Sequence, residues 1–341
     1  MRRCLFFAVA AILLLSCQGG NKTLPDSGRG IYYWKTDFRI TPSDSAFLAD
    51  HRIDRIYLRY FDVVLSNKAI TGYSGAIPNA SVTFSSPVPE GLEIVPVVFF
   101  TLEALHDMTV SGSIPAIARK VWERVDAMSR ANGVPAIRQI QIDCDYTEMS
   151  REGYFALCEA LADILHAHGV RLSSTLRLHQ LRDKVPPVDA VALMLYNTGN
   201  FRRPDVENSI LDPDIVKTYL KRRYNLPVSI ALPVYGWGIW LRDGKYKSIL
   251  HRSDYSDTLL YAPLDGNRFT VKADHILEGH ALQQGDVIRR ELSLYETVAQ
   301  VHDYAVDRLH PSQVILYHLD SLCLSRYSSQ EIETLYCYEQ D

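Results

Sequence analysis

The sequence predicts an α/β fold, specifically a (β/α)8 TIM barrel with a small β-rich insertion after strand 7. Short apolar runs typical of buried strands recur along the chain, and amphipathic helical patterns lie between several of them. The runs number eight, the strand count of a closed barrel. They are residues 31–34, 55–61, 94–100, 139–145, 171–178, 190–196, 228–234 and 314–317. A doubly wound open sheet is the alternative, but no GxGxxG or Walker loop follows any of these runs.

Length and composition fit this architecture. The chain has 341 residues, 47% hydrophobic and 22% charged, which excludes a mostly disordered or collagen-like protein. A barrel of this type routinely occupies about 250 residues or more. The formal net charge is −4 and there is no block of Lys and Arg, so nothing in the charge pattern favours binding of nucleic acid.

Helices are expected between the strands, and two segments interrupt the alternation. The helical patterns cover residues 114–132, 150–168, 213–223 and 292–307. Residues 63–91 are rich in Ser, Gly, Pro and Asn, which predicts a long loop after the second strand. Residues 237–290 contain Asp-Gly pairs at 243–244 and 265–266, which are favoured in hairpin turns. This stretch therefore predicts the β-rich insertion between the seventh strand and its helix.

The N-terminus carries the features of a lipoprotein signal peptide over residues 1–16. Two arginines precede an unbroken apolar run over residues 5–15, shorter than the roughly 20 residues needed to cross a bilayer. The run ends in Leu-Leu-Ser-Cys, which resembles a bacterial lipobox and implies that Cys17 is acylated, with palmitate, as the first mature residue. Residues 17–28 then form a tether and residues 29–341 the barrel. The acyl chains imply membrane anchorage at the cell envelope, and Gln18 in place of Asp implies the outer rather than the inner membrane.

The remaining cysteines give no indication of a metal or another cofactor. Cys144, Cys158, Cys323 and Cys337 form no CxxC pair and have no His at zinc spacing. Disulfides in an oxidising envelope are possible, but burial as small hydrophobic side chains is the preferred interpretation. We expect Cys144 and Cys158 to lie side by side under the helix over residues 150–168.

Candidate functional residues follow from the alternation of side chains along the strand over residues 139–145. Ile140, Ile142 and Cys144 share the parity expected to face the helices. The opposite parity, which would point into the barrel, carries Gln139, Gln141, Asp143 and Asp145, with Glu148 just beyond. Barrel active sites lie at the C-terminal ends of the strands. Carboxylates there are costly unless they are functional or fully hydrogen-bonded, so a structural polar network is the alternative.

The next strand places basic side chains beside these carboxylates. Arg177 and His179 share the parity of Ser173 and Thr175 and should reach the barrel mouth near Asp145. An arginine lowers the pKa of neighbouring carboxyls, and histidine exchanges protons near neutral pH. A purely structural Arg–Asp pair is the alternative. The second strand adds Arg59 and Asp62, whose orientation the pattern does not fix.

Three of these segments together resemble the motifs of family 18 glycoside hydrolases. Residues 141–148 (QIDCDYTE) are similar to the DxxDxDxE motif of that family, residues 193–197 (LMLYN) to MxYD, and residues 231–238 (ALPVYGWG) to PxYG. The order and spacing match across residues 29–341, and chitinases of this family also carry an insertion after strand 7. The chain as a whole also resembles lipoproteins of Bacteroidetes whose mature part begins with YYWKT, here residues 32–36.

The resemblance implies a glycan-cleaving barrel that uses the substrate's acetamido group as nucleophile. Asp145 corresponds to the assisting Asp, Asp143 to the one before it, and Tyr196 to the tyrosine that supports the acetamido oxygen. Two positions depart from the pattern. Thr147 stands where the family has its catalytic acid, and the glutamate falls one residue later, at Glu148, where a side chain near a strand end points elsewhere. The Asp of MxYD is Asn197, and barrels of this family that lack the acid bind glycans without cleaving them.

Aromatic side chains at the strand ends also point to a carbohydrate cleft, because sugar rings stack on them. They are Tyr33, Trp34, Tyr60, Tyr196, Tyr235, Trp237, Trp240 and Tyr317. We therefore predict a cell-envelope lipoprotein that hydrolyses or binds glycan. Its expected catalytic residues are Asp143, Asp145 and Glu148, the last as general acid. Its expected substrate-binding residues are Arg59, Arg177, His179, Tyr196, Asn197, Tyr235 and Trp237.

Two alternatives remain open. One is a non-catalytic glycan-binding or envelope-assembly lipoprotein on the same scaffold. The other is a metal site built on Asp143 and Asp145, which is weaker because no His lies at a defined spacing from them.

Overall fold

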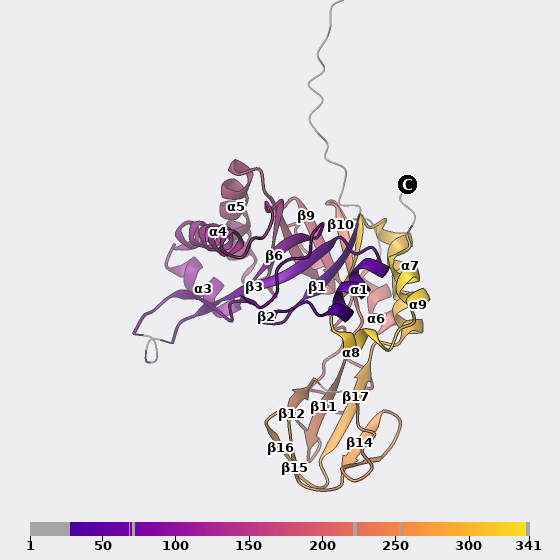
Figure 1. The fold of residues 1–341 in the computed structure, drawn as a ribbon. Coiled ribbons are helices and arrows are strands. Elements are labelled where there is room, and N and C mark those ends of the chain that lie inside the picture. The colour runs from indigo at the N-terminus through magenta and orange to yellow at the C-terminus, as the bar shows by residue number, and fades with distance from the viewer. Residues whose placement is uncertain (1–27, 68, 70–71, 221–223, 252–253, 339–341) are drawn as a thin grey trace, which may run out of the picture.

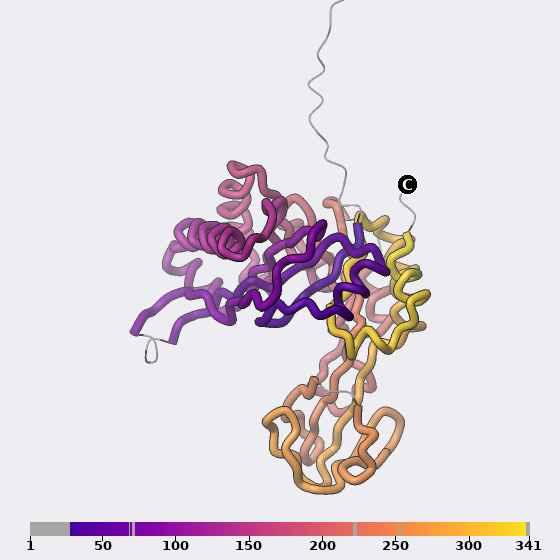
Figure 2. The backbone as a smooth tube through the Cα atoms, viewed as in Figure 1, coloured from indigo at the N-terminus to yellow at the C-terminus, as the bar shows by residue number. Residues whose placement is uncertain are grey.

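The computed structural model describes residues 28–338 except 68, 70–71, 221–223 and 252–253. Eight parallel strands close into a barrel, because β1 pairs with β3 on one side and with β18 on the other. Figures 1 and 2 show the barrel at the centre of the upper part of the molecule. Its strands are β1 (Arg29–Tyr33), β3 (Arg55–Leu65), β6 (Glu93–Phe100), β7 (Gln139–Asp143), β8 (Arg171–Arg177), β9 (Ala190–Met194), β10 (Val228–Pro233) and β18 (Gln313–Tyr317). All eight predicted runs are barrel strands, so the predicted fold class is confirmed.

Helices lie on the outside of the barrel and, at residues 321–324, at the C-terminal ends of its strands. They are α1 (Pro42–Asp50), α3 (Leu102–Val110), α4 (Ile114–Ala131), α5 (Arg151–Ala167), α6 (Pro213–Tyr219), α7 (Tyr295–Leu309), α8 (Ser321–Leu324) and α9 (Ser329–Tyr336), with a 3₁₀ turn η1 (Leu178–Arg182). The prediction that a helix begins at residue 292 is wrong, because Leu292 pairs with Gly236 in a strand. Within the part of the chain that the structure describes, no helix combines the length and apolarity needed to cross a bilayer.

The segment over residues 63–91 is more ordered than the predicted loop. The apolar end of β3 runs on to Leu65 and pairs in antiparallel fashion with β4 (Ala76–Asn79). β5 (Thr83–Phe84) then pairs with β2 (Asp37–Phe38). The β3–β4 hairpin therefore extends beyond the edge of the barrel, at the left of Figure 1.

Between β10 and α7 the chain forms a separate β-structure, which hangs below the barrel in Figure 1. Its main sheet has the order β12-β11-β17-β14-β13, and a short hairpin joins β15 to β16. The strands are β11 (Gly236–Arg242), β12 (Lys245–Leu250), β13 (Tyr261–Pro263), β14 (Arg268–Val271), β15 (His275–Leu277), β16 (His280–Leu282) and β17 (Val287–Leu292). Asp243 and Gly244 join β11 to β12 with φ of 52° and 67°, the left-handed conformation that a tight hairpin turn requires.

The barrel interior carries a layer of hydrogen-bonded polar side chains. The Tyr32 hydroxyl on β1 donates to Gln141 Oε1 on β7 at 2.7 Å, and the Tyr57 hydroxyl on β3 donates to Gln313 Oε1 on β18 at 2.6 Å. β1 and β7 are not neighbours in the sheet, so the Tyr32–Gln141 bond crosses the barrel. The inward direction predicted for Gln141 is therefore observed.

The outward face of β7 packs under α5. Cys144 and Cys158 are 1% and 0% exposed, and both are close to the Tyr154 side chain. Burial raises the pKa of both thiols. Both are free, as are Cys323 and Cys337, so these four form none of the disulfides that were the alternative. The preferred interpretation of burial is confirmed for Cys144 and Cys158 and wrong for Cys337, which is exposed, and for Cys323, which is only partly buried.

Candidate functional site

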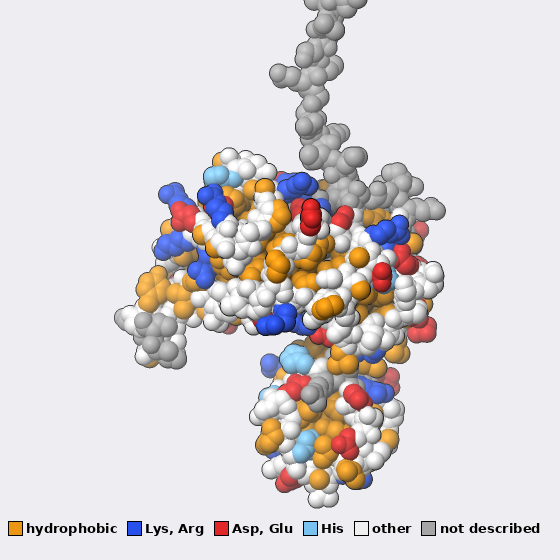
Figure 3. Space-filling view, viewed as in Figure 1, with side chains coloured by type: hydrophobic (Ala, Val, Ile, Leu, Met, Phe, Trp, Pro, Cys, Tyr) orange, Lys and Arg blue, Asp and Glu red, His pale blue; other side chains and the backbone are white. Residues whose placement is uncertain are grey.

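A cavity of about 700 Å³ opens where the C-terminal ends of the barrel strands meet the insertion. In Figure 3 the molecule narrows between these two parts, and Lys or Arg and His side chains lie beside the narrow region. The cavity is lined by Trp34, Lys35, Arg59, Phe99, Asp143, Asp145, Arg177, Met194, Tyr196, Asn197, Tyr235, Gly236, Trp237, His251, Glu278, Tyr317, His318, Asp320, Leu322 and Cys323. Its position is that of the active site in barrels of this architecture.

Asp143 forms part of the cavity floor. It is the last residue of β7 and is 2% exposed. The Thr175 hydroxyl on β8 donates to its Oδ1 at 2.6 Å. Burial raises the pKa of Asp143, and nearby Arg177 together with the Thr175 bond offsets this rise only in part. Asp143 is thus a carboxyl group whose protonated form the fold favours more than water does.

Asp145 lies above it, nearer the solvent. Its side chain is 52% exposed, and Arg177 Nε donates to Asp145 Oδ1 at 2.5 Å. Gln180 holds the end of β8 in place, because its Oε1 accepts from the Arg177 backbone N–H while its Nε2 donates to the Tyr146 carbonyl. The structure therefore fixes an Arg–Asp ion pair at the barrel mouth, as the strand parity predicted.

Aromatic rings form the walls around these charges. Tyr196, Tyr235 and Tyr317 contact one another, with centroids 5.1 to 6.1 Å apart. Trp237 contacts Tyr235 at 5.3 Å, and Trp34 contacts Tyr317 at 6.0 Å. Burial raises the pKa of the Tyr196, Tyr235 and Tyr317 hydroxyls, which keeps them protonated as hydrogen-bond donors. The Tyr196 hydroxyl is buried with no hydrogen-bond partner in the part of the chain that the structure describes.

Asn197 and Arg59 also take fixed positions. The Tyr235 hydroxyl donates to Asn197 Oδ1 at 2.7 Å. Arg59 Nε donates to Asp62 Oδ1 at 2.8 Å, its Nη2 also bonds Asp62, and the guanidinium lies 5.6 Å from the Trp34 ring centroid. The strand pattern left the orientation of Arg59 open, and the structure turns it into the cavity.

Two predicted site residues do not line the cavity. Glu148 is exposed in the turn that precedes α5. Tyr146 is buried against Tyr154, and the Thr147 N–H bonds Ser150 Oγ at 2.9 Å, so the chain turns away from the barrel mouth before residue 148. His179 is exposed on η1, where the strand has already ended at Arg177. Both placements were wrong, because strand alternation stops with the strand.

The cavity also holds ionisable side chains that the sequence analysis missed. Lys35 Nζ lies 3.0 Å from Asp320 Oδ2. His318 is largely enclosed, and burial lowers its pKa to about 4, so its imidazole is neutral at physiological pH. Lys35 lies two residues beyond the end of the first strand, and His318 and Asp320 lie one and three residues beyond the end of the eighth. The rule that sites lie at strand ends therefore applies to them equally. His251 and Glu278 reach the cavity from the insertion, a position that no local pattern predicts.

The carboxylates do not assemble a metal site. Among the described residues, no group of three His, Cys, Asp or Glu side chains lies close enough to hold a metal ion. Asp143 and Asp145 instead bond Thr175 and Arg177.

Comparison with known proteins identifies the fold. The sequence matches no family model and no curated protein. A chitinase from Chromobacterium violaceum has a similar structure, with a TM-score of 0.53 at 12% identity over 91% of this chain and 98% of that one. A family 18 chitinase from Flavobacterium johnsoniae gives 0.50 at 10% identity, over 91% and 94% of the two chains. The second catalytic domain of an Ostrinia furnacalis chitinase, in complex with an N-acetylglucosamine oligomer, gives 0.51 at 9% identity, over 91% and 95%.

The chain folds as a TIM barrel similar to those of the compared chitinases. At identities this low the similarity establishes the fold, and the chemistry has to be argued from this chain's own cavity.

Proposed function

We propose that this protein binds a glycan in the cavity at the barrel mouth and does not hydrolyse it. The observation that carries the proposal is an aromatic-walled cavity that lacks a glutamate at the position of the family's catalytic acid. Thr147 stands where family 18 enzymes have their catalytic glutamate, and neither Thr147 nor Glu148 lines the cavity.

The lining suits a carbohydrate. Trp34, Tyr235, Trp237 and Tyr317 supply ring faces on which the C–H faces of sugars stack. Asp143, Asp145, Arg177 and Asn197 supply polar groups between these rings. Binding pockets of this kind combine apolar walls with a few fixed polar groups that orient the ligand.

Among its described residues, the same cavity offers no free carboxyl group to act as general acid. Asp145 is engaged by Arg177, and Asp143 lies on the floor, bonded to Thr175. Burial alone would raise the pKa of Asp320, but the Lys35 ammonium outweighs it and lowers that pKa, which keeps the carboxyl ionised. Glu278 accepts from the His251 backbone N–H at 2.8 Å. A general acid must present its proton within hydrogen-bond reach of the leaving oxygen. Each of these four carboxyl groups is already bonded to a group of the protein, which does not favour proton transfer to a substrate.

Hydrolysis is the second candidate. Asp143, Asp145 and Tyr196 occupy the motif positions that the family uses to assist the acetamido group, and the compared structures are chitinases. Hydrolysis with Glu148 as general acid requires residues 146–150 to rearrange so that Glu148 enters the cavity. We propose oligomers of N-acetylglucosamine as the first ligands to test, because the Ostrinia furnacalis domain carries one.

The test of binding is titration calorimetry with chito-oligosaccharides and with glycan fragments of peptidoglycan. Trp237→Ala removes a cavity wall and should weaken binding about tenfold or more, as aromatic anchors do. Trp122→Ala is the matched control, because Trp122 lies on α4 and stacks on His168 outside the cavity. Equal affinities for the wild type and the Trp237 variant, or no binding of any glycan, would remove the support for this function.

We also propose that the protein is anchored in the cell envelope through Cys17, at the outer membrane. The support is the Leu-Leu-Ser-Cys site after the apolar run, which lies outside the described residues. Cys17→Ala should abolish fatty-acid labelling and move the protein out of the detergent phase. Unchanged labelling and partitioning in this variant would exclude the anchor.

A further inference from the structure

A buried ion pair in the insertion lies directly behind the wall of the cavity. Arg289 and Glu291 stand two residues apart on β17 and therefore on the same face of the strand, and both are 0% exposed. Arg289 Nε donates to Glu291 Oε1 at 2.7 Å. Neither residue lines the cavity.

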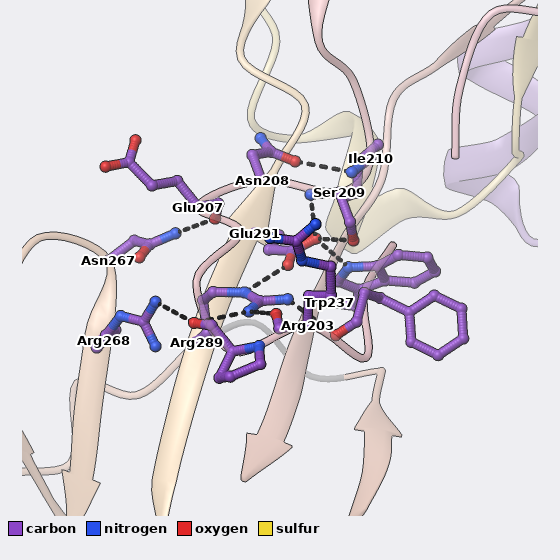
Figure 4. A network of polar contacts seen from close by, with 12 residues as sticks. Arg203, Glu207, Asn208, Ser209, Ile210, Trp237, Asn267, Arg268, Arg289 and Glu291 are labelled. Atoms are coloured by element: carbon purple, nitrogen blue, oxygen red, sulfur yellow. Dashed lines mark hydrogen bonds and ion pairs between the residues drawn. The ribbon is translucent and has the colours of Figure 1, made fainter. Parts of the chain in front are cut away.

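The second oxygen of Glu291 collects three donors. It accepts from the Trp237 indole Nε1 at 2.8 Å, from the Ser209 backbone N–H at 2.9 Å and from the Ser209 hydroxyl at 2.6 Å. Figure 4 shows the indole and Ser209 turned toward this carboxylate from two different segments. Glu291 thus joins the cavity-lining ring on β11 to the loop between β9 and α6.

Arg289 fixes the same loop from the other side. Its guanidinium donates to the carbonyls of Phe201 at 3.0 Å and Arg203 at 2.7 Å. The Phe201 ring in turn contacts the Trp237 ring, with centroids 6.2 Å apart. Trp237 is therefore held at its nitrogen by Glu291 and along its ring by a loop that Arg289 anchors.

Stability alone gives little reason for this arrangement. A buried ion pair is often no more stabilising than an apolar pair of the same size, because two charges must leave water. This pair instead sets the orientation of the Trp237 ring, which remains partly exposed in the cavity. The indole has one N–H donor, and its bond to a fixed acceptor sets the plane of the ring.

We propose that Glu291, held by Arg289, is a positioning residue that fixes the Trp237 ring for stacking on the glycan. This inference rests on the proposed function. A preset ring does not have to be ordered when ligand binds, and ordering one side chain weakens binding by roughly three- to tenfold.

The test compares Glu291→Gln with Asp286→Asn. Asp286 is a matched control in the same insertion: its buried carboxylate accepts from the Trp240 indole at 2.8 Å and pairs with Arg242, but Trp240 does not line the cavity. Glu291→Gln should weaken glycan binding about three- to tenfold and increase the mobility of Trp237, measured by ¹⁹F NMR of fluorotryptophan. Asp286→Asn should leave both unchanged in the folded protein.

A second variant avoids any folding defect from leaving Arg289 unpaired. Replacing Trp237 by benzothienylalanine keeps the shape of the ring and removes the N–H, so it should reproduce the loss of affinity while Arg289 and Glu291 remain paired. Wild-type affinity in this variant, or equal losses in the Glu291 and Asp286 variants, would overturn the positioning role. If the wild type binds no glycan, the proposed function fails, and the ¹⁹F measurement still decides whether Glu291 holds the ring.

Discussion

Tyr32→Phe should destabilise the barrel by about 1–3 kcal/mol and leave glycan affinity unchanged. Tyr32 is 0% exposed and Gln141 is 1% exposed, and the 2.7 Å bond between them crosses the barrel beneath the cavity. Phe fills the same space, so the variant loses the hydroxyl without opening a large void. The cost is then that of leaving Gln141 Oε1 buried without this donor.

Urea denaturation and thermal melting measure this cost. A loss of about 1–3 kcal/mol corresponds to a fall in Tm of roughly 2–6 °C in a domain of this size. The double variant Tyr32→Phe/Gln141→Met removes both polar partners, so its cost should be smaller than the sum of the two single costs. Tyr57→Phe provides a comparison, because its hydroxyl makes the equivalent bond to buried Gln313.

Two results would refute this reasoning. A cost below about 0.5 kcal/mol would mean that water or another group replaces the hydroxyl, and that the Tyr32–Gln141 bond does not stabilise the barrel interior. A loss of glycan affinity as large as that of Trp237→Ala would mean that the layer also shapes the cavity.

Three further predictions concern charge and burial. Burial alone would raise the pKa of Glu333, but hydrogen bonds from His51, Arg29 and Arg52 outweigh it and lower the pKa to about 2. The ionised Glu333 carboxylate therefore stabilises the folded state above the unfolded pKa of about 4.5, and this stabilisation is lost as pH falls through 2. Glu333→Gln should lower the free energy of unfolding by about 1 kcal/mol at pH 7. It should also make that free energy fall less steeply at acid pH. In Asp143 the pKa is raised by burial, so the folded state holds the proton longer than the unfolded state and stability falls as pH rises above 3.8. Asp143→Asn keeps an acceptor for Thr175 and should remove that fall, as urea titrations across pH would show; an unchanged pH profile would contradict the burial argument. Cys144 and Cys158 should resist a thiol reagent in the native protein while exposed Cys337 reacts, and equal rates for all three would contradict the packing under α5.

Strand alternation correctly predicted that Asp143 lies on the cavity floor, because the direction of a side chain on a strand follows a local rule. Asp143 is still paired in the sheet, opposite Phe99, and its direction follows from the parity of β7. Glu148 and His179 lie beyond the last strand residues, where a turn and a 3₁₀ helix set the direction instead. Thus the prediction succeeded within the backbone ladder and at Asp145, two residues beyond β7, and it failed at His179 and Glu148, where the chain has already turned.

The support of the site depends on contacts that no local pattern contains. Trp237 follows the seventh strand and was predicted to bind substrate, but its hydrogen-bond acceptor Glu291 is 54 residues away in the sequence. His251 and Glu278 enter the cavity because the insertion folds next to the barrel mouth. Such positions follow from tertiary packing, and a single sequence carries no periodic signal for them.

Recovery of the ligand after binding tests the central claim most directly. The wild-type protein is saturated with a chito-oligosaccharide, binding is measured by calorimetry, and the oligosaccharide is then recovered and analysed by mass spectrometry. We predict heat of binding together with intact oligosaccharide after prolonged incubation. Shorter oligosaccharides in the wild type that disappear in Glu148→Gln would contradict the claim, because they would show that Glu148 reaches the cavity and acts as the acid.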